Sequence, residues 1–276
     1  MKRFGLFVGI FISIFRLGIA QQKPLQQDYL FFGSEIEKEI WNSEQKNPYQ
    51  LFKAVNALPD LPDEKWDILV KELDQKAGKE KDQLSLLRTI FQKTHQRLLR
   101  KYEQHSSFNA MLSEGKFDCV SGSAALGLLL DRYGYDFDVV ETDYHVFIQV
   151  RLDEKTIILE STLPVGGMIT LPSEVDKYLS AYLPQKDAKA TSFNQRLAGQ
   201  AIDIREGTIF RKVNLTELAG LQYYNDAIVH FNTQQYGQAV QQLSKAYLLY
   251  PSDRIEGLRE LSIDLAYKTF GYDLRK

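Results

Sequence analysis

The residues best suited to chemistry in this sequence are a cysteine, a histidine and a glutamate on one stretch of the chain: Cys119, His145 and Glu160. A thiol can attack a carbonyl carbon, an imidazole can take its proton, and a carboxylate can orient the imidazole. His145 begins one strand-like segment, and Glu160 ends the next. A hairpin turning near 153–154 would pair these two residues directly, with both side chains on one face of a sheet. The spacing therefore predicts a Cys-His-Glu triad.

The position of Cys119 favours a nucleophile. Asp118 is a good helix N-cap, which makes Cys119 the first residue of an apolar helix that Gly134 can end. Unpaired backbone N–H groups and the helix dipole at that end are expected to lower the pKa of the thiol. The N–H of Cys119 could also donate to an oxyanion. The uninterrupted apolar run 124–130 predicts a central helix that is buried nearly all round.

Other polar residues near the predicted site are less informative. Asp143 and Tyr144 either line the cleft or end a turn, and His95, among Lys and Arg on a helical segment, is expected to be solvated. A second oxyanion donor could come from residues upstream of the cysteine, among which the spacing singles out none: Ser106, Ser107 and Asn109. Each triad member also has an ordinary role: Cys119 as a small buried residue, His145 at a strand edge, and Glu160 as a solvated charge.

Composition excludes several classes of protein. A 44% hydrophobic and 25% charged chain has the composition of a globular protein, and its single cysteine allows neither an internal disulfide nor a Cys-based metal site. A formal net charge of −2 gives no electrostatic reason to expect nucleic acid binding. The sequence implies no metal and no organic cofactor.

The first twenty residues resemble a secretory signal peptide. Lys2 and Arg3 precede an apolar run, and small residues precede Gln21. Cleavage would remove three basic residues and no acidic one, and it would leave no integral membrane domain. The alternative is an uncleaved amphipathic anchor. The expected location is therefore secreted or periplasmic.

The remaining chain is expected to have an α+β fold. Residues 28–104 have helical periodicity, and residues 105–118 are expected to form a loop before the cysteine helix. β-branched and aromatic residues then predict strands at 137–142, 145–150 and 156–160, with a polar turn at 152–155. Pro172 is expected to begin another helix, and residues 201–213 are expected to form a last β-ribbon. Residues 185–199 between them are polar and show little hydrophobic periodicity.

The C-terminal region has the pattern of a helical hairpin. Large and small residues and a closing proline resemble one copy of the tetratricopeptide repeat over residues 220–253: Tyr223, Ala227, Tyr236, Ala239, Leu243, Ala246 and Pro251. One copy followed by a helix over 254–270 must pack against the preceding domain to be stable. The alternative to a repeat is an unrelated helical hairpin. The expected division is a signal peptide at 1–20, a domain at 21–213 and a helical region at 214–276.

The segments FDCVSGSAALGLLLDRYGY, YHVFIQV and TIILESTLP, within residues 117–164, together resemble the transglutaminase-like superfamily. The resemblance implies a papain-like α+β core, with Cys119 as nucleophile, His145 as general base and acid, and Glu160 as the orienting acid. Two positions depart from the usual pattern: Glu160 stands where Asp is common, and Phe147 stands where Trp is common.

The expected function is acyl transfer from a peptide or amide through a thioester, with water as the expected acceptor, which would make the protein a cysteine peptidase or amidase. The C-terminal helices could additionally hold a protein partner. Two alternatives remain: an inactive module that binds a peptide or protein in the cleft, and a structural scaffold whose cleft is filled by its own loop, for instance residues 163–171.

Overall fold

The computed structural model describes residues 30–43, 47–57, 59, 63–79, 82–182 and 209–275. The expected signal peptide, the polar segment 185–199 and the first part of the expected ribbon at 201–213 lie outside these residues. The helices are α1 (Glu35–Asn42), α2 (Pro48–Ala54), α3 (Glu64–Ala77), α4 (Gln83–Arg97), α5 (Phe108–Glu114), α6 (Cys119–Arg132), α7 (Pro172–Ser180), α9 (Leu215–Asn232), α10 (Tyr236–Leu249) and α11 (Asp253–Phe270).

The strands form one main antiparallel sheet. They are β1 (Lys101–Tyr102), β2 (Lys116–Phe117), β3 (Asp136–Thr142), β4 (Val146–Leu152), β5 (Lys155–Leu159), β6 (Met168–Ile169) and β7 (Phe210–Val213). The main sheet has the order β6-β5-β4-β3-β7, and β1 and β2 form a separate parallel pair. The expected α+β class and the expected polar turn are confirmed.

The turn between β4 and β5 consists of two residues. Leu152 pairs with Lys155, and both Asp153 and Glu154 have positive φ angles, of 49° and 62°. Two consecutive positive φ angles are the mark of a type I′ turn, whose twist matches that of the flanking strands. The hairpin is therefore held in register by its turn as well as by its side chains.

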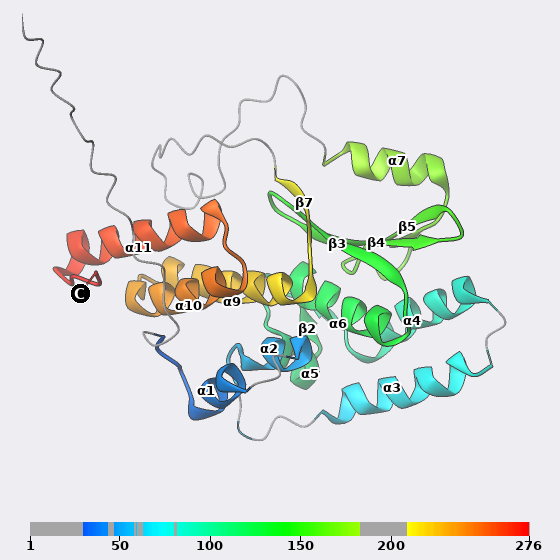
Figure 1. The fold of residues 1–276 in the computed structure, drawn as a ribbon, viewed down its shortest axis with the longest axis horizontal. Coiled ribbons are helices and arrows are strands. Elements are labelled where there is room, and N and C mark those ends of the chain that lie inside the picture. Colours follow the sequence, from blue (N-terminus) through cyan, green and yellow to red (C-terminus); the bar gives the residue numbers. More distant parts are fainter. Residues whose placement is uncertain are drawn as a thin grey trace, which may run out of the picture.

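Helices cover both faces of the main sheet (Figure 1). α7 lies over one face, where a small apolar cluster joins Val140, Phe147 and Ile158 of the sheet to Val175. The alternate residues of β4 and β5 point to the other face and join the main core with α6 and α4. The sheet is thus an inner layer, so the ends of its strands are where polar side chains can reach solvent.

The central helix α6 begins at the expected residue. The Asp118 side chain accepts a hydrogen bond from the N–H of Ser121, and the Ser121 hydroxyl accepts one from the N–H of Asp118. This reciprocal capping box fixes the first turn of the helix. The run 124–130 is buried apart from a half-buried Leu128, as the sequence predicts.

Residues 105–118 do not form a simple loop, so that prediction is wrong. Ser107 caps α5 by accepting from the N–H of Ala110, and Gly115 ends the helix in a left-handed conformation, at a φ of 77°. Phe108, Met111 and Leu112 face the core at helical spacing. A helix of two turns gives too few apolar positions for its period to stand out in the sequence.

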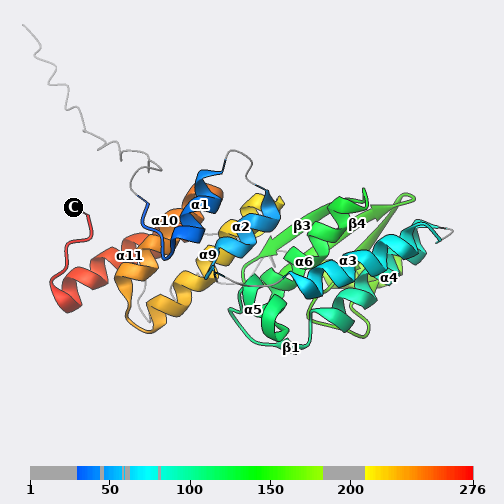
Figure 2. The same ribbon diagram turned by 90° about the horizontal axis from the view of Figure 1, so that it is seen from below.

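The C-terminal helices pack as a hairpin followed by a third helix. The six large and small residues that suggested a repeat are all buried, and Gly220 lets α9 approach α10 closely, since a Cβ there would lie 2.8 Å from Tyr250 Cβ. Figure 2 shows α1 and α2 lying along α9 and α10, and α3 and α4 beside α6. The main apolar core extends from the sheet through α6 to the C-terminal helices.

The N-terminal helix is attached to the hairpin by a buried polar cluster. Lys245 Nζ lies 2.6 Å from Glu37 Oε1, which also accepts a hydrogen bond from the Tyr223 hydroxyl at 3.0 Å. Trp41 Nε1 in turn donates to that hydroxyl oxygen at 2.9 Å. The hairpin surface around Tyr223 and Lys245 is therefore covered by the chain's own α1.

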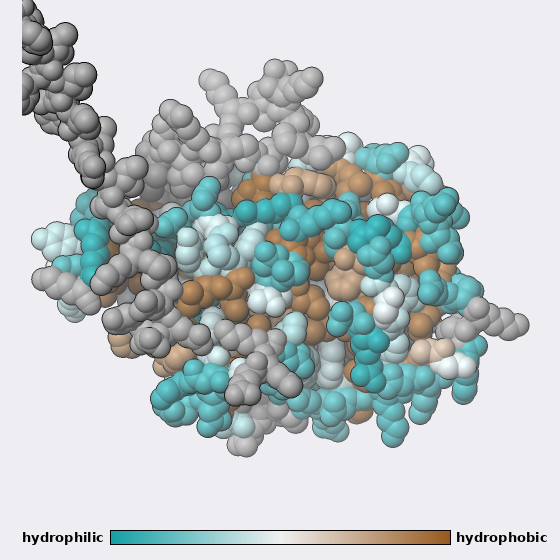
Figure 3. All heavy atoms as spheres, viewed as in Figure 1, coloured by the Kyte–Doolittle hydropathy of each residue, from teal (hydrophilic) through white to brown (hydrophobic). Residues whose placement is uncertain are grey.

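The surface is mixed in character. On the face seen in Figure 3, hydrophobic side chains reach the surface among hydrophilic ones, mainly over the sheet and beside α7. Among the described residues, no helix combines the length and the apolar content needed to cross a membrane.

Candidate functional site

His145 and Glu160 form a direct hydrogen bond, although not in the register that the sequence suggested. Ile148 pairs with Leu159, so Glu160 lies just beyond the end of β5 and two residues out of step with His145. The prediction of direct pairing is wrong. The offset is an even number of residues, which keeps both side chains on one face of the sheet. His145 Nε2 lies 2.5 Å from Glu160 Oε2.

The carboxylate of Glu160 is held by two further residues. Oε1 accepts from the backbone N–H and the hydroxyl of Thr162, at 2.8 and 2.5 Å, and Oε2 accepts from the Tyr178 hydroxyl at 2.5 Å. Burial alone would raise the pKa of Glu160, but the hydrogen bonds and charge of its partners, with His145 foremost, hold that pKa below its ordinary value. Glu160 is therefore an anion in a fixed orientation.

The imidazole of His145 is positioned by the sheet and by α7. Its backbone N–H donates to the Thr142 hydroxyl at 3.1 Å, and its carbonyl accepts from the N–H of Thr142 at 2.8 Å. The ring stacks on Tyr182, with centroids 5.9 Å apart and planes 18° apart. Its side chain is 18% exposed, against 3% for Glu160. The ring is thus clamped on one side and open on the other.

Cys119 is the first residue of α6 and is partly exposed. Burial and the neighbouring carboxyl of Asp118 raise the pKa of its thiol, and the N–H groups of Val146 and of Cys119 itself oppose that rise only in part. The expectation of a lowered pKa is therefore wrong, because burial of the thiol, and after it the charge of the N-cap Asp118, outweigh these N–H groups. A thiol with a raised pKa is a good nucleophile only after a base has taken its proton.

The buried acid next to Cys119 is connected to the C-terminal helices. Asp118 Oδ1 accepts from Ser121, and Oδ2 accepts from Asn225 Nδ2 of α9 at 2.9 Å. Burial raises the pKa of Asp118, against the effect of these hydrogen bonds. Asn225 thus holds the N-cap of α6 from a distant part of the chain.

Cys119 and His145 line the same cleft, of about 110 Å³. Four regions close it around them. The turn between β3 and β4 contributes Asp143 and Tyr144, as the sequence allowed, and the loop after β1 contributes Gln104 and His105. The other walls come from the C-terminal helices, with Asn225 on α9 and Arg254 on α11. The cleft therefore joins the predicted nucleophile to the predicted base.

Some of the lining residues carry no signal in the sequence. Arg254 lies at the start of α11, where its guanidinium contacts the buried carboxylate of Glu141 at 2.7 Å. Glu141 also pairs with Arg211 at 2.9 Å and accepts from the Tyr250 hydroxyl. Pairing of β3 with β7 and packing of α11 bring these residues together, so their spacing in the chain is uninformative. They give the cleft one wall of paired charges.

The upstream polar residues proposed as oxyanion donors have structural roles. Ser107 caps α5, and Asn109 Nδ2 donates to the carbonyls of Lys53 and Val55 at 2.9 Å each. Ser106 is buried and does not line the cleft. The described loop 163–171, which could have filled the cleft, does not line it either. The cleft is therefore not closed by that loop.

His95 is buried, so the prediction of a solvated side chain is wrong. It packs edge-on against Phe91, with ring centroids 4.6 Å apart, and neither ring nitrogen has a hydrogen-bond partner among the described residues. Burial lowers its pKa to about 4, although the negative charge of Glu160 acts in the opposite direction. The basic neighbours that suggested solvation lie on the other side of α4.

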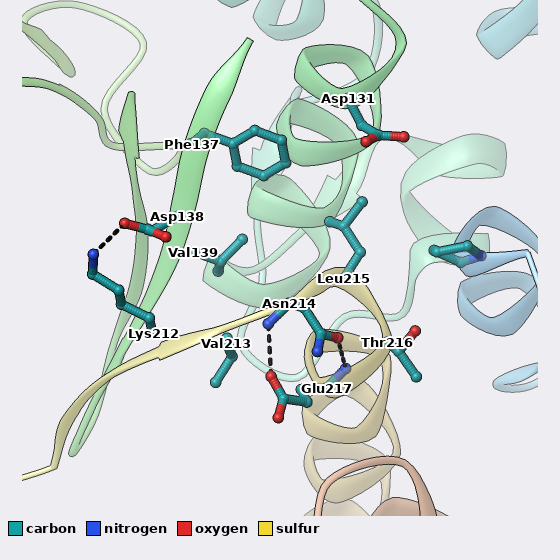
Figure 4. Close-up of a pocket in the computed structure, with 11 residues that line it drawn as sticks. Asp131, Phe137, Asp138, Val139, Lys212, Val213, Asn214, Leu215, Thr216 and Glu217 are labelled. Carbon is teal, nitrogen blue, oxygen red and sulfur yellow. Dashed lines mark hydrogen bonds and ion pairs between the residues drawn. The ribbon is translucent and has the colours of Figure 1, made fainter. Parts of the chain in front are cut away.

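A wider depression of about 600 Å³ lies between α6, β3, β7 and the start of α9 (Figure 4). Four of its polar residues bind one another in two pairs. Asn214 and Glu217 exchange backbone-to-side-chain hydrogen bonds at 2.7 and 2.9 Å, and Lys212 pairs with Asp138 at 2.6 Å. Neither cysteine nor histidine is among its described lining residues. The smaller cleft at Cys119 is the better candidate for chemistry.

Comparison of the chain with protein-family models, with curated proteins and with solved structures finds no match. Within the described residues, no group of three or more His, Cys, Asp or Glu side chains is placed to hold a metal ion. What the site does is therefore inferred from its own geometry and chemistry.

Proposed function

We propose that this protein is a cysteine hydrolase or acyl transferase that acts on peptide or amide bonds through Cys119, His145 and Glu160. The observation that carries the proposal is the 2.5 Å hydrogen bond between His145 and Glu160 beside a cleft that also contains Cys119. A nucleophile, a base and a group that orients the base are the parts this chemistry requires.

The reaction would proceed through a thioester. His145 takes the proton of the Cys119 thiol as sulfur attacks the carbonyl carbon, and the carbonyl electron pair moves to oxygen. The tetrahedral intermediate collapses when the C–N bond breaks, and His145 gives its proton to the leaving amine. Water, activated by His145, then releases the acid and the free thiol. Glu160 stabilises the imidazolium form that exists between these transfers.

The resemblance of residues 117–164 to the transglutaminase-like superfamily supports the same chemistry. In this proposal α6 is the central helix of a papain-like core, and the sheet that carries His145 packs against it. The proposal includes export of the mature chain, since the first twenty residues have the pattern of a signal peptide. Water is the proposed acceptor.

One observation favours a second candidate, a module that binds a peptide or protein without turnover. Burial and Asp118 raise the pKa of Cys119, so the thiol is protonated at neutral pH unless His145 accepts its proton. A fold that has lost activity would keep the cleft and the hydrogen bonds of Glu160 but would not transfer an acyl group.

The test is turnover of a broad peptide and amide library by the wild type and by Cys119→Ala. The proposal predicts release of amine or ammonia by the wild type and none by the variant. Binding of library members by both proteins, with release by neither, would favour the non-catalytic module. Release by Cys119→Ala at the wild-type rate would contradict a cysteine nucleophile.

A further inference from the structure

His105 occupies an unusual position in the wall of the cleft. It lies in the loop between β1 and α5, with a left-handed backbone conformation at a φ of 62°. Residues other than glycine adopt this conformation rarely, and it is found more often where function requires it. The His105 ring lines the cleft together with Cys119 and His145. Its neighbours at 106, 107 and 109 were candidates by their position in the sequence, and His105 was not.

The two nitrogens of this ring differ. Nδ1 is buried and has no hydrogen-bond partner among the described residues. Burial lowers the pKa of His105, so the ring is neutral at neutral pH and carries one proton. A buried N–H without an acceptor is costly, which favours the tautomer with the proton on Nε2. The ring therefore offers one uncharged N–H donor, on Nε2.

An acyl transfer at Cys119 needs such a donor. The carbonyl oxygen of the substrate becomes negative when sulfur attacks, and two donors are the usual minimum for stabilising it. The N–H of Cys119, at the first position of α6, can supply one. The earlier candidates for the second, Ser107 and Asn109, make the structural hydrogen bonds described above.

We propose that His105 is a catalytic residue whose Nε2–H donates to the oxyanion formed when Cys119 attacks a carbonyl group. This inference rests on the proposed function. In the step concerned, the S–C bond forms, the carbonyl π pair moves to oxygen, and the thiol proton goes to His145. His105 keeps its proton throughout and stabilises the charge on oxygen. It acts as a neutral electrophile, a role distinct from that of His145.

The test compares two reactions of Cys119 in the full mature chain. Acylation by p-nitrophenyl acetate passes through an oxyanion, whereas alkylation by iodoacetamide does not. The variant H105N keeps a residue that tolerates the left-handed conformation, but its amide nitrogen lies near the position of Nδ1. The variant H105Q places an amide N–H near the position of Nε2. His230→Gln, on the partly exposed end of α9, is the matched histidine control.

The expected result is that H105N lowers the acylation rate constant roughly 100-fold, with alkylation changed less than about twofold. H105Q should recover part of the acylation rate, and His230→Gln should react like the wild type in both assays. Equal acylation by H105N and wild type would overturn the inference. So would a parallel fall in both reactions, which would mean that His105 acts on the thiol or on folding.

Two further outcomes separate this inference from the proposed function. If Gln104→Ala slows acylation alone and H105N does not, the donor is Gln104, and the proposed function stands without His105. If wild-type Cys119 is acylated no faster than free cysteine, the proposed function itself fails, and the role of His105 fails with it.

Discussion

The carboxylate of Glu160 accepts four hydrogen bonds from three residues, and this arrangement determines what His145 can do. His145 and Tyr178 donate to Oε2, and Thr162 donates twice to Oε1. A carboxylate can accept at both oxygens, whereas an amide presents N–H donors at one of them. In either orientation, the NH₂ group of a glutamine side chain would therefore face N–H or O–H groups that donate to Glu160 in the wild type.

Glu160→Gln should lower the rate constant for acylation of Cys119 by about 100- to 10,000-fold, because the tautomer and orientation of His145 are lost. The variant should also lower the free energy of unfolding by about 1–3 kcal/mol at neutral pH. Single-turnover release of p-nitrophenol and urea unfolding measure the two effects. An acylation rate constant close to that of wild type would mean that Glu160 does not support the base.

The pH dependence of stability provides a second check on Glu160. Its folded pKa is lowered, so the stabilisation is complete above its ordinary pKa of about 4.5 and is lost as pH falls through the lower folded value. The stability difference between wild type and Glu160→Gln should therefore narrow below about pH 4.5. Tyr178→Phe removes one donor and keeps the anion, so it should retain most of this pH dependence.

The buried imidazole of His95 should make the protein sensitive to mild acid. Its pKa falls from 6.5 in the unfolded chain to about 4 in the fold, so the unfolded state binds a proton first as pH is lowered. The free energy of unfolding should fall by about 3 kcal/mol between these two pH values.

Replacement of this residue tests that prediction directly. His95→Leu should flatten the pH dependence of urea unfolding between pH 6.5 and 4. His230 behaves in the opposite way, because Asp226 raises its pKa, so His230→Gln should lose stability at the acid end of this range. An unchanged slope in His95→Leu would show that His95 is hydrated in the folded protein.

At the scale of elements, α6, which begins with Cys119, closely approaches the end of the hairpin that carries Glu160. A Cβ on Gly122 would lie 2.8 Å from Ser161 Oγ and 2.9 Å from Ser161 Cβ. Ser161 follows Glu160 directly, and Gly122 is one turn after Cys119. The absence of a side chain at 122 therefore sets the distance between the two halves of the site.

Gly122→Ala should lower the free energy of unfolding by about 1–3 kcal/mol and also slow acylation of Cys119. Gly127→Ala is the matched control on the same helix, because its Cβ would meet the flexible end of the Leu215 side chain and no residue of the segment directly after Glu160. That variant should lose stability and keep the acylation rate. Equal loss of acylation in both would mean that the close approach at Gly122 has no particular role.

The elements that could be predicted from the sequence are those whose cap, turn and apolar residues have the same role in the fold that they suggest in the sequence. Asp118 and the apolar run after Cys119 located α6, and the polar pair Asp153-Glu154 located the hairpin turn. The predicted register was two residues off because pairing His145 with Glu160 centres the hairpin one residue before the observed turn, which Leu152 and Lys155 flank. The helix α5 was missed because seven residues are too few to show a helical period. The burial of His95 was missed because charged neighbours in the sequence do not show which face of a helix is buried.

At the scale of the whole molecule, α1 is joined to the C-terminal hairpin by buried polar contacts. Glu37 of α1 and Lys245 of α10 form a buried ion pair, and burial lowers the pKa of Lys245 although Glu37 opposes the shift. Removing one charge from such a pair leaves the other buried without compensation. The pair therefore couples folding of the N-terminal helix to that of the hairpin.

Glu37→Gln and Lys245→Met should each lower the free energy of unfolding by about 3–5 kcal/mol, and the double variant by clearly less than the sum. A double-mutant cycle in urea unfolding measures the coupling. Additive losses would indicate that the ion pair is open to solvent, and α1 would then not be fixed to the hairpin.

The large-scale arrangement was only partly predictable. The repeat-like spacing from Tyr223 to Ala246 predicted the hairpin. Because one repeat is not stable by itself, it also predicted that the hairpin packs against the preceding region. Nothing in that pattern indicated that Asn225 would hold the carboxyl of Asp118 or that Arg254 would line the cleft. Such contacts join residues more than one hundred positions apart, so they follow from the packing of whole elements.

The central claim is that His145, held by Glu160, activates Cys119 as an acyl acceptor. Its most direct test is the pre-steady-state release of p-nitrophenol from p-nitrophenyl acetate by wild type and His145→Ala at neutral pH, with intact mass to locate the acetyl group. The account predicts a burst equal to the protein concentration and one acetyl group on Cys119. It also predicts that His145→Ala slows the burst at least about 100-fold. A wild-type burst no faster than acetylation of free cysteine, or equal bursts in the two proteins, would contradict it.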